Sequence, residues 1–444
     1  MTAFQDQIAD ALGRDLPPAV RVVETDQAAL GSWFNVSDLA VASFGAAAAE
    51  LAALLGERTV TVSRRRVLRW FGMTLRPIGW TLPAAWDAIA GDYRASDGWI
   101  KLHTNAPHHR ARALQVLGCD ATKEAVAQAV GAWGKTALET AIVEAGGCAA
   151  AMHSLAVWQN HPQGLAVGRA PLIEWRDSDA AGRPLALEGL RVLDLTRVLA
   201  GPVATRFLAG FGAQVLRIDP PDWNEPGVEP EVTLGKRCAG LDLRSKAGRR
   251  AFEELLGAAD VLVHGYRPGA LAGLGYSAQE MRGIAPALID VSLCAYGREG
   301  PWAERRGFDS LVQMSSGIAA EGMARSGSAR PVPLPVQALD HATGYLMAAA
   351  VLRAIRRRQA TGASLSARLS LARTAALLIS GGVAETAAEA AAAMPDDAGA
   401  DIGPGIENTG WGEARRVAFP MALSAGRPRW RFPSGPLRRH EAGW

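Results

Sequence analysis

A strand, a turn, a helix and a second strand follow one another within Leu190–Pro221, and this stretch constrains the fold more than any other. Leu190–Leu195 is a short apolar run of the kind found in buried strands, and Ala213–Ile218 is another. Between them, Val203–Phe211 carries apolar residues at helical spacing, directly after Pro202, which suits a first helical turn. Strand, helix and strand in about thirty residues form a βαβ unit, so we predict a parallel sheet.

Ligands of parallel α/β sheets bind beyond the carboxyl ends of the strands. This rule places Thr196, Arg197, Gly201 and Asp219 at a candidate site. The turn lacks the three-glycine fingerprint of dinucleotide-binding proteins, so it does not indicate NAD or FAD. From these residues alone, a plain sheet core without a ligand is an equal alternative.

Composition argues against several classes of protein. The 444 residues suffice for two or three domains, and 49% hydrophobic with 20% charged residues is typical of a soluble enzyme. A net charge of +3, without a basic run interleaved with aromatics, argues against a nucleic-acid partner. Four cysteines without a CxxC pair indicate reduced thiols rather than disulfides or a zinc site. We find no signal-peptide core and no membrane-spanning stretch, and therefore expect a cytoplasmic protein without a membrane partner or a metal.

The pattern of strands and helices divides the chain into parts. Strands that alternate with helices predict a doubly wound, mostly parallel α/β domain, accompanied by a smaller α+β domain that opens with a hairpin over Asp92–Leu102. Residues 174–187 are expected to be a linker. The predicted parts are an N-terminal helical segment (1–92), the small α+β domain (93–178), the large α/β domain (187–378) and a tail packed on the large domain (379–444).

Two stretches far apart in the chain repeat one pattern. Asp38 and Asp340 each stand near the start of an alanine-rich helix, which is followed by a glycine, a short strand and a basic run. Chance similarity of two alanine-rich helices is the alternative. If the repeat is real, the chain carries the second part of one unit ahead of the first part of another.

Four ordered blocks resemble the family III CoA-transferases, the group that includes formyl-CoA transferase, carnitine CoA-transferase and α-methylacyl-CoA racemase. The blocks contain LEGLRVLDLTRVLAGPV, GKRCAGLDLRSKAG, LIDVSLCAYGREGPW and VPLPVQALDHATGYL, and together they cover about residues 187–378. The resemblance implies a Rossmann-like large domain that binds CoA, and a homodimer. It also implies acyl-CoA and a carboxylic acid as small-molecule substrates, with no permanently bound cofactor.

The order of the domains departs from the family pattern. YRASDGWIKL and the helices after it resemble the family's smaller domain, which normally lies downstream of the Asp340-type helix. Here it lies upstream. Residues 35–178 therefore look like a family carboxyl-terminal half placed in front, in agreement with the repeat.

By resemblance, the nucleophile is an aspartate at the start of the helix after a proline-rich turn, which is Asp340. A carboxylate can attack a thioester to give a mixed anhydride and then an enzyme-bound CoA thioester, which divides a difficult exchange into easier steps. A helix amino terminus favours the ionised carboxylate. Plain capping is the alternative for Asp340. Asp38 has no CoA-site blocks ahead of it and is expected to be a cap or a relic.

CoA carries phosphates, so its site needs basic side chains and backbone N–H groups near strand ends. Arg267 stands out, because it lies between an aromatic residue and a proline where a strand ends. For each basic residue a solvated surface charge is the alternative. The residues predicted to bind CoA are Arg197, Val198, Ala200, Lys236, Arg237, Tyr266, Arg267, Pro268, Tyr296 and Gly297.

The racemase branch of the family needs a histidine one residue before the aspartate of the GFDS-like block. That position is Phe308, ahead of Asp309. His341 directly follows Asp340, but neighbouring helical residues face different ways, so it does not substitute. CoA transfer is therefore favoured over racemisation or isomerisation, and a non-catalytic CoA-binding subunit is the third alternative. The acid is not specified by these residues.

Overall fold

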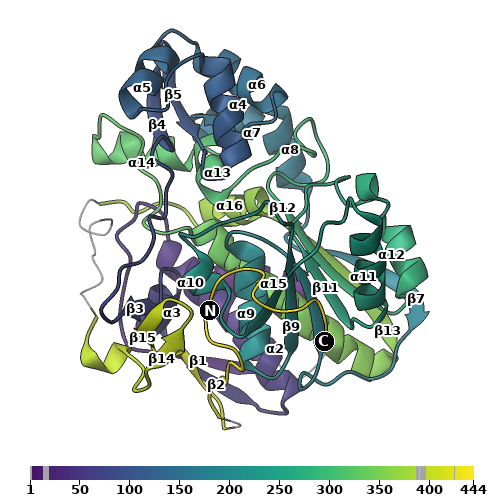
Figure 1. The fold of residues 1–444 in the computed structure, drawn as a ribbon. Coiled ribbons are helices and arrows are strands. Elements are labelled where there is room, and N and C mark those ends of the chain that lie inside the picture. The colour runs from purple at the N-terminus through teal and green to yellow at the C-terminus, as the bar shows by residue number, and fades with distance from the viewer. Residues whose placement is uncertain (1–2, 14–19, 387–389, 391–396, 425) are drawn as a thin grey trace.

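A seven-stranded sheet forms the centre of the computed structural model, which describes residues 3–13, 20–386, 390, 397–424 and 426–444. Its strand order is β10-β9-β8-β11-β12-β13-β7, and all neighbours are parallel except β13 and β7 (Figure 1). This confirms the predicted mostly parallel α/β fold. The strands are β7 (Glu174–Ala181), β8 (Arg191–Leu195), β9 (Gln214–Asp219), β10 (Lys236–Gly240), β11 (Val261–His264), β12 (Ile289–Cys294) and β13 (Ala363–Ser370).

Strand β7 corrects one expectation, because residues 174–181 are not a linker. They pair antiparallel with β13 and close that edge of the sheet. The polar sequence EWRDSDAA suits an edge strand that is not covered on both faces, and this is why it resembled a linker.

Alternate side chains along the central strands face two separate cores. Val192 and Val215 face a core shared with α9 and α15, whereas Leu193 and Leu216 face a core shared with α11 and α12. Since both faces are covered, the central strands carry apolar residues on both faces. The helices of this domain are α9 (Ala200–Gly210), α10 (Glu229–Val232), α11 (Lys246–Gly257), α12 (Ala278–Ile284), α13 (Asp309–Ser315), α14 (Ile318–Ser326), α15 (Ala338–Thr361) and α16 (Leu371–Ser380).

The small domain lies at the top of Figure 1, on the side where the parallel strands end. The predicted hairpin is formed by β4 and β5, and β6 completes an antiparallel sheet. Arg305 of the large domain pairs with Glu139 at 2.6 Å and donates to the carbonyl of Ala149 at 2.7 Å, which fixes the two domains together. The elements are β4 (Gly91–Ala95), β5 (Gly98–Leu102), β6 (Ala149–Ala151), α4 (Pro107–Leu117), α5 (Lys123–Gly131), α6 (Lys135–Glu144), α7 (Leu155–Asn160) and α8 (Pro162–Arg169).

The N-terminal segment and the C-terminal tail interleave. One small sheet has the order β1-β2-β16 and another β14-β15-β3, so each combines both ends of the chain. The tail also runs along the edge strand β10, where the N–H of Gly235 donates to the carbonyl of Phe432 at 2.8 Å. The tail therefore packs on the N-terminal segment as well as on the large domain. These elements are α1 (Ala3–Leu12), β1 (Arg21–Thr25), α2 (Val36–Leu54), β2 (Thr59–Ser63), α3 (Arg64–Trp70), β3 (Leu75–Pro77), β14 (Glu407–Thr409), β15 (Gly412–Arg416) and β16 (Met421–Ala422).

The two long helices α2 and α15 begin with the same backbone turn. The N–H of Val36 donates to the carbonyl of Phe34 at 2.7 Å, and the N–H of Ala338 donates to that of Val336 at 2.7 Å. The residues that precede the helices have nearly equal dihedral angles, φ −74° and ψ 53° in α2, and φ −74° and ψ 64° in α15.

The strands after these helices match as well. Strand β2 ends at Ser63, whose hydroxyl accepts from the N–H of Arg66 at 3.3 Å and caps α3. Strand β13 ends at Ser370, which accepts from the N–H of Arg373 at 3.3 Å and caps α16. Each strand has one parallel and one antiparallel neighbour. The repeat predicted from the sequence is thus present in the backbone.

Helix α2 is, among the described residues, the one helix long and apolar enough to cross a membrane. The expectation that no stretch reaches this length is therefore wrong. However, 78% of its apolar window is buried inside the protein. Its Glu50 forms ion pairs with Arg353 at 3.4 Å and Arg356 at 2.7 Å on α15, the pattern of a core helix.

Candidate functional site

The carboxyl ends of the central strands and the small domain enclose a crevice of about 390 Å³. Asp340, the predicted nucleophile, lies on it together with half of the predicted CoA-binding residues. From the large domain the crevice is lined by Arg197, Val198, Ala200, Asp222, Trp223, Tyr266, Arg267, Arg306, Phe308 and Asp340, among others, and from the small domain by His108 and His109.

Asp340 lies in the first turn of α15 and is 7% exposed. The carboxylate of Asp309, at the start of α13, accepts the N–H groups of Leu339 at 2.8 Å and Asp340 at 3.0 Å, and it also accepts from the amide of Gln313. Within the described part of the chain, no hydrogen bond to the Asp340 carboxylate is formed, and the helix cap is Gln337. Asp340 is thus not a cap, and Asp309 positions its backbone.

Burial raises the pKa of Asp340 well above its usual range, and the neighbouring Asp309 carboxylate raises it further. Burial also raises the pKa of Asp309 to about 6, although its hydrogen bonds oppose the change. The expected stabilisation of the ionised form by the helix terminus is therefore outweighed by desolvation and like charge. A carboxylate that is unpaired and poorly solvated is a stronger nucleophile once ionised.

We expect the Asp309→Asn variant to shift the acidic limb of the pH–activity profile to lower pH. Removal of the like charge lowers the pKa of Asp340, so a larger fraction is ionised at a given acidic pH. The measurement is kcat/KM between pH 4 and 9, with Asp38→Asn as the control that leaves the limb in place. An acidic limb that is unchanged in Asp309→Asn, or that moves to higher pH, would show that the Asp309 carboxylate does not raise the pKa of Asp340.

The matching aspartate of the repeat is paired. Asp38 Oδ1 accepts from Arg64 Nη2 at 2.7 Å. Arg64 is the first residue of α3, and the first residue of the matching helix α16 is Leu371, which lines the crevice beside Asp340. The position occupied by Leu371 near Asp340 is thus occupied by Arg64 near Asp38. Asp38 is not the helix cap, which is Asn35, so its role is an ion pair.

The turn after β8 has a strained residue at the crevice. Val198 has a φ of 62°, in the left-handed region that β-branched residues rarely adopt. Its N–H donates to Glu225 Oε2 at 2.8 Å, and Trp223 Nε1 donates to the same oxygen at 2.9 Å. Such strain persists only where the surroundings fix it, and it is concentrated at functional sites.

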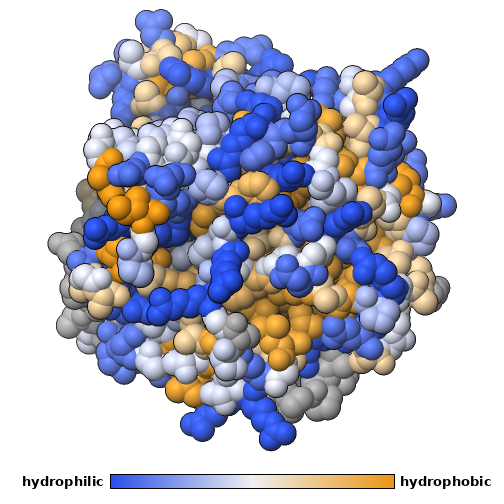
Figure 2. Space-filling model, turned by 60° about the horizontal axis from the view of Figure 1, so that its bottom comes forward, coloured by the Kyte–Doolittle hydropathy of each residue, from blue (hydrophilic) through white to orange (hydrophobic). Residues whose placement is uncertain are grey.

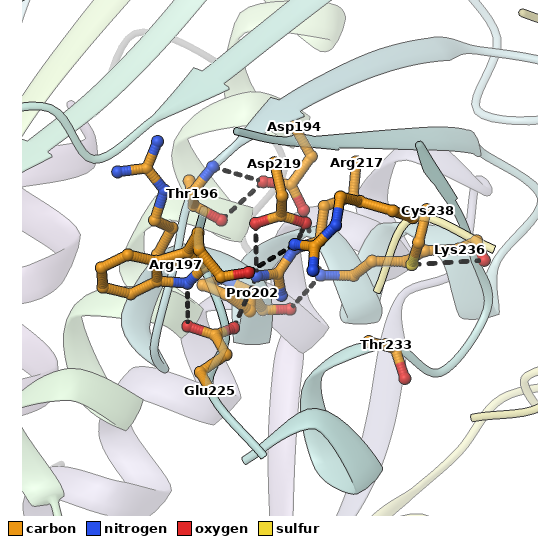
Figure 3. A network of polar contacts seen from close by, with 12 residues as sticks. Asp194, Thr196, Arg197, Pro202, Arg217, Asp219, Glu225, Thr233, Lys236 and Cys238 are labelled. Carbon is orange, nitrogen blue, oxygen red and sulfur yellow. Dashed lines mark hydrogen bonds and ion pairs between the residues drawn. The ribbon is translucent and has the colours of Figure 1, made fainter. Parts of the chain in front are cut away.

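A buried ion-pair network beneath this turn fixes Glu225 (Figure 3). Arg217 donates to both oxygens of Asp219 at 2.9 Å and to Glu225 Oε1 at 2.5 Å. Burial opposes the charge on Arg217, but the Glu225 and Asp219 carboxylates outweigh it and raise its pKa. Asp219 is fully buried, so it supports the turn and does not line the crevice.

Lys236 belongs to a second buried cluster. Its Nζ donates to Asp194 Oδ2 at 3.0 Å and to the carbonyl of Pro202 at 3.0 Å, while the N–H of Thr196 donates to Asp194 Oδ1 at 2.9 Å (Figure 3). These contacts fix the start of α9. Lys236 is fully buried and does not reach the crevice, in contrast to the expectation that it binds CoA.

The structure places five of the predicted CoA-binding residues outside the crevice lining, namely Lys236, Arg237, Pro268, Tyr296 and Gly297. Arg237 lines a different cavity, at the other end of the strands. Tyr296 is buried, with its hydroxyl 3.0 Å from Ser315 Oγ, because the loop after β12 turns inward below the small domain. Gly297 follows it in that loop with a φ of 98°.

Of the four residues that the rule for strand ends placed at the site, Arg197 lines the crevice, whereas Thr196, Gly201 and Asp219 do not. The Arg197 guanidinium lies 5.0 Å from the ring centroid of Trp223 and 4.9 Å from that of Tyr266, and Nη2 donates to the Tyr266 hydroxyl at 2.7 Å. A guanidinium fixed between two rings is ready to bind an anion with its remaining N–H groups. Trp223 was missed because it lies in an irregular loop after two prolines.

The small domain supplies residues that sequence reasoning missed. His108 and His109 lie in the first turn of α4, and the Phe308 ring stacks on His103 at 3.8 Å. Burial lowers the pKa of His109 to about 3 and also lowers that of His108. Both are neutral at pH 7. No local signal predicts that α4 is placed over the strand ends, since this depends on domain packing.

Comparisons with known proteins agree on the large domain. Residues 187–407 match CoA-transferase family III. A succinyl-CoA:glutarate CoA-transferase from Mus musculus is 34% identical over 216 residues, which cover 46% of this chain and 49% of the relative. A probable fatty acyl-CoA transferase, Rv3272 from Mycobacterium tuberculosis, is 33% identical over 190 residues, 40% of this chain and 48% of the relative.

A crystal structure of Rv3272 aligns with 45% of this chain and 58% of that chain, at 29% identity and a TM-score of 0.39. The chain spans about half the length of the curated relatives it matches. The matched segment contains six of the seven strands of the central sheet, Asp340 and the turns of the large domain that line the crevice. Residues 187–407 of this chain are thus similar to CoA-transferase family III.

Proposed function

We propose that the protein transfers CoA between an acyl-CoA thioester and a carboxylic acid, with Asp340 as the nucleophile. The observation that carries the proposal is the unpaired Asp340 carboxylate on a crevice that also presents Arg197 and Arg267. The names of the relatives, succinyl-CoA:glutarate and acyl-CoA transferases, support the same reaction class.

The reaction proceeds in two matched halves. The Asp340 carboxylate attacks the thioester carbonyl, the C–S bond breaks, and CoA leaves as a thiolate from a mixed anhydride. The thiolate then attacks the aspartyl carbonyl, which releases the first acid as a carboxylate and leaves an aspartyl-CoA thioester. The incoming carboxylate attacks this thioester, and the same steps in reverse give the new acyl-CoA and restore Asp340.

The crevice residues have separate tasks in this reaction. Arg197 and Arg267 bind the phosphates of CoA, with Tyr266 beside them, while the Val198 turn and Ala200 approach the ligand with the backbone at the start of α9. Asp309 fixes the helix turn that carries Asp340. No permanently bound cofactor takes part.

Trapping of the intermediate tests the proposal. The protein is incubated with succinyl-CoA and treated with hydroxylamine or borohydride, and modified peptides are identified by mass spectrometry. We expect a hydroxamate or a reduced side chain at Asp340, in wild-type protein and in Asp38→Asn. Absence of modification at Asp340, with CoA binding intact, would favour a non-catalytic CoA-binding subunit.

Exchange of the α-proton of an acyl-CoA, as in racemisation or isomerisation, is the second candidate. One observation favours it, because His109 lines the same crevice as Asp340, although a pKa lowered to about 3 makes its imidazole a weak base. Phe308 argues against it. Deuterium from solvent at the α-carbon, without trapping at Asp340, would support exchange over transfer.

Arg267→Ala is expected to weaken CoA binding by about 10- to 150-fold, the effect of losing a charge-assisted hydrogen bond. The Arg267 side chain is 38% exposed on the crevice, and its nearest carboxylate is 3.9 Å away. Binding of a pantetheine thioester, which lacks the nucleotide phosphates, is expected to be unchanged. An equal loss for both ligands would mean that Arg267 does not bind the nucleotide.

We also propose that the protein is cytoplasmic. The four cysteines are free, three of them buried, which suits a reducing compartment.

We further propose that the protein is a homodimer. Helix α2, the counterpart of α15 in the N-terminal segment, already packs beside α15, so this segment supplies within one chain part of the contacts that a dimer partner would make. Light scattering coupled to gel filtration distinguishes a dimer from a monomer.

A further inference from the structure

A second cavity, of about 710 Å³, lies at the opposite end of the parallel strands from the crevice. It is lined by residues 209–216, between α9 and β9, and by an extended segment of the tail, residues 426–432, which we name the strap. The six residues of β9 separate this end from the crevice by about 20 Å. Figure 2 turns the bottom of the molecule, where the strands begin, toward the reader, and hydrophilic side chains there surround apolar ones.

The strap presents three arginines to this cavity. Arg427, Arg429 and Arg431 alternate with Pro428 and Trp430, and in an extended chain alternate side chains point to opposite sides. All three arginines line the cavity and are exposed. A fourth, Arg237, joins them from the edge strand β10.

Contacts with α9 fix the strap in place. The N–H of Arg429 donates to the carbonyl of Gly210 at 2.7 Å, and Trp430 Nε1 donates to the carbonyl of Arg206 at 3.0 Å. The Trp430 ring stacks on Trp70 with 5.8 Å between centroids and 17° between planes. The direction of the arginines is therefore set by the fold.

The positive charge of this cavity is not balanced. In the part of the chain that the structure describes, no ion pair joins Arg427, Arg429, Arg431 or Arg237 to a carboxylate, and Glu188 is the one acidic residue in the lining. Arg237 donates instead to the carbonyl of Gly443 at 3.0 Å. Four guanidinium groups around one hollow, with little compensating charge, favour a multiply charged anion.

We propose that this cavity binds a small molecule with two or more linked phosphate groups. Guanidinium groups match phosphate oxygens in pairs, and the volume is that of a small-molecule site rather than of a flat docking surface. The ligand is either an inorganic oligophosphate or a nucleoside phosphate, whose base would lie against the Phe432 and Trp444 rings of the lining. The site is separate from the proposed transfer reaction, because Asp340 lies at the other end of the strands.

Titration calorimetry of the full chain with inorganic tripolyphosphate and with ATP tests this site. The test variant is Arg429→Ser/Arg431→Ser, and the control is Arg250→Ser, which removes an exposed arginine of α11 that lines neither cavity. We expect wild-type protein and the control to bind tripolyphosphate alike, and the double variant to bind about 100-fold more weakly, tenfold for each arginine. Circular dichroism checks that the double variant is folded.

The outcome separates the sources of the ligand and the two sites. Tripolyphosphate and ATP binding with equal affinity supports recognition of the phosphates alone, and tighter binding of ATP, lost in the double variant, supports a nucleoside phosphate. If neither probe binds wild-type protein, or if the double variant binds as well as wild type, the proposal is overturned. These results do not depend on trapping at Asp340, so the two proposals can fail separately.

Discussion

Asp340→Asn is expected to abolish the exchange of labelled acid into acyl-CoA, by at least about a thousandfold, while the fold is kept. The side chain makes no hydrogen bond within the described residues and does not cap α15, so the substitution removes the proposed nucleophile without breaking a hydrogen bond. The measurement is exchange of labelled carboxylate at saturating acyl-CoA. Asp38→Asn is the matched control, because Asp38 occupies the same place in the repeat and is paired with Arg64.

The same variant is expected to be more stable than wild type at neutral pH. The pKa of Asp340 is raised in the folded protein, so the contribution of this one group to stability is greatest below its ordinary pKa of 3.8 and is lost as the pH rises through the raised pKa. Asparagine resembles the protonated carboxyl group and does not ionise, so the variant does not lose stability as the pH rises. Urea denaturation of both proteins between pH 4 and 9 should show curves that diverge as the pH rises. Full exchange activity in Asp340→Asn, or curves that stay parallel, would contradict this view of the residue.

Local sequence signals predicted the central sheet and the helix that begins near Asp340, because both depend on residues that are close in the chain. The βαβ unit at Leu190–Pro221 and the helix that carries Asp340 needed only apolar spacing, turns and the family blocks. Lys236 and Arg237 were misplaced for a physical reason. Both residues lie at the start of β10, whereas ligands bind where parallel strands end. They therefore lie at the opposite end of the strands from the crevice.

Features that depend on distant packing could not be predicted. His108 and His109 reach the crevice only because Arg305 and α13 attach the small domain to the large one. The ion pair between Arg64 and Asp38 could not be predicted either. The repeat around Arg64 is present in the sequence, but the sequence does not show that its side chain contacts Asp38. The sequence predicted a basic run after each of the two strands. The structure adds that Arg64, the first residue of α3, occupies the place that Leu371 has at the start of α16, where Leu371 lines the crevice with Asp340.

Arg217→Met is expected to lower the free energy of unfolding by about 3–5 kcal/mol, because it leaves the Asp219 and Glu225 carboxylates buried without their cationic partner. It should also weaken CoA binding, since Glu225 holds the N–H of the strained Val198. Urea denaturation measures the first effect and titration with CoA the second. Arg250→Met is the control, because the Arg250–Glu254 pair is solvent-exposed and its loss should leave stability unchanged.

A neutral triple variant, Arg217→Met/Asp219→Asn/Glu225→Gln, separates two origins of this loss. If unpaired buried charge destabilises Arg217→Met, removing all three charges together should recover much of the stability. The glutamine oxygen can still accept the N–H of Val198, so CoA affinity should recover as well. A triple variant as unstable as the single one would show that the packing of the Arg217 side chain, and not its charge, supports the turn. In that case the network would stabilise the sheet without setting the geometry of the crevice.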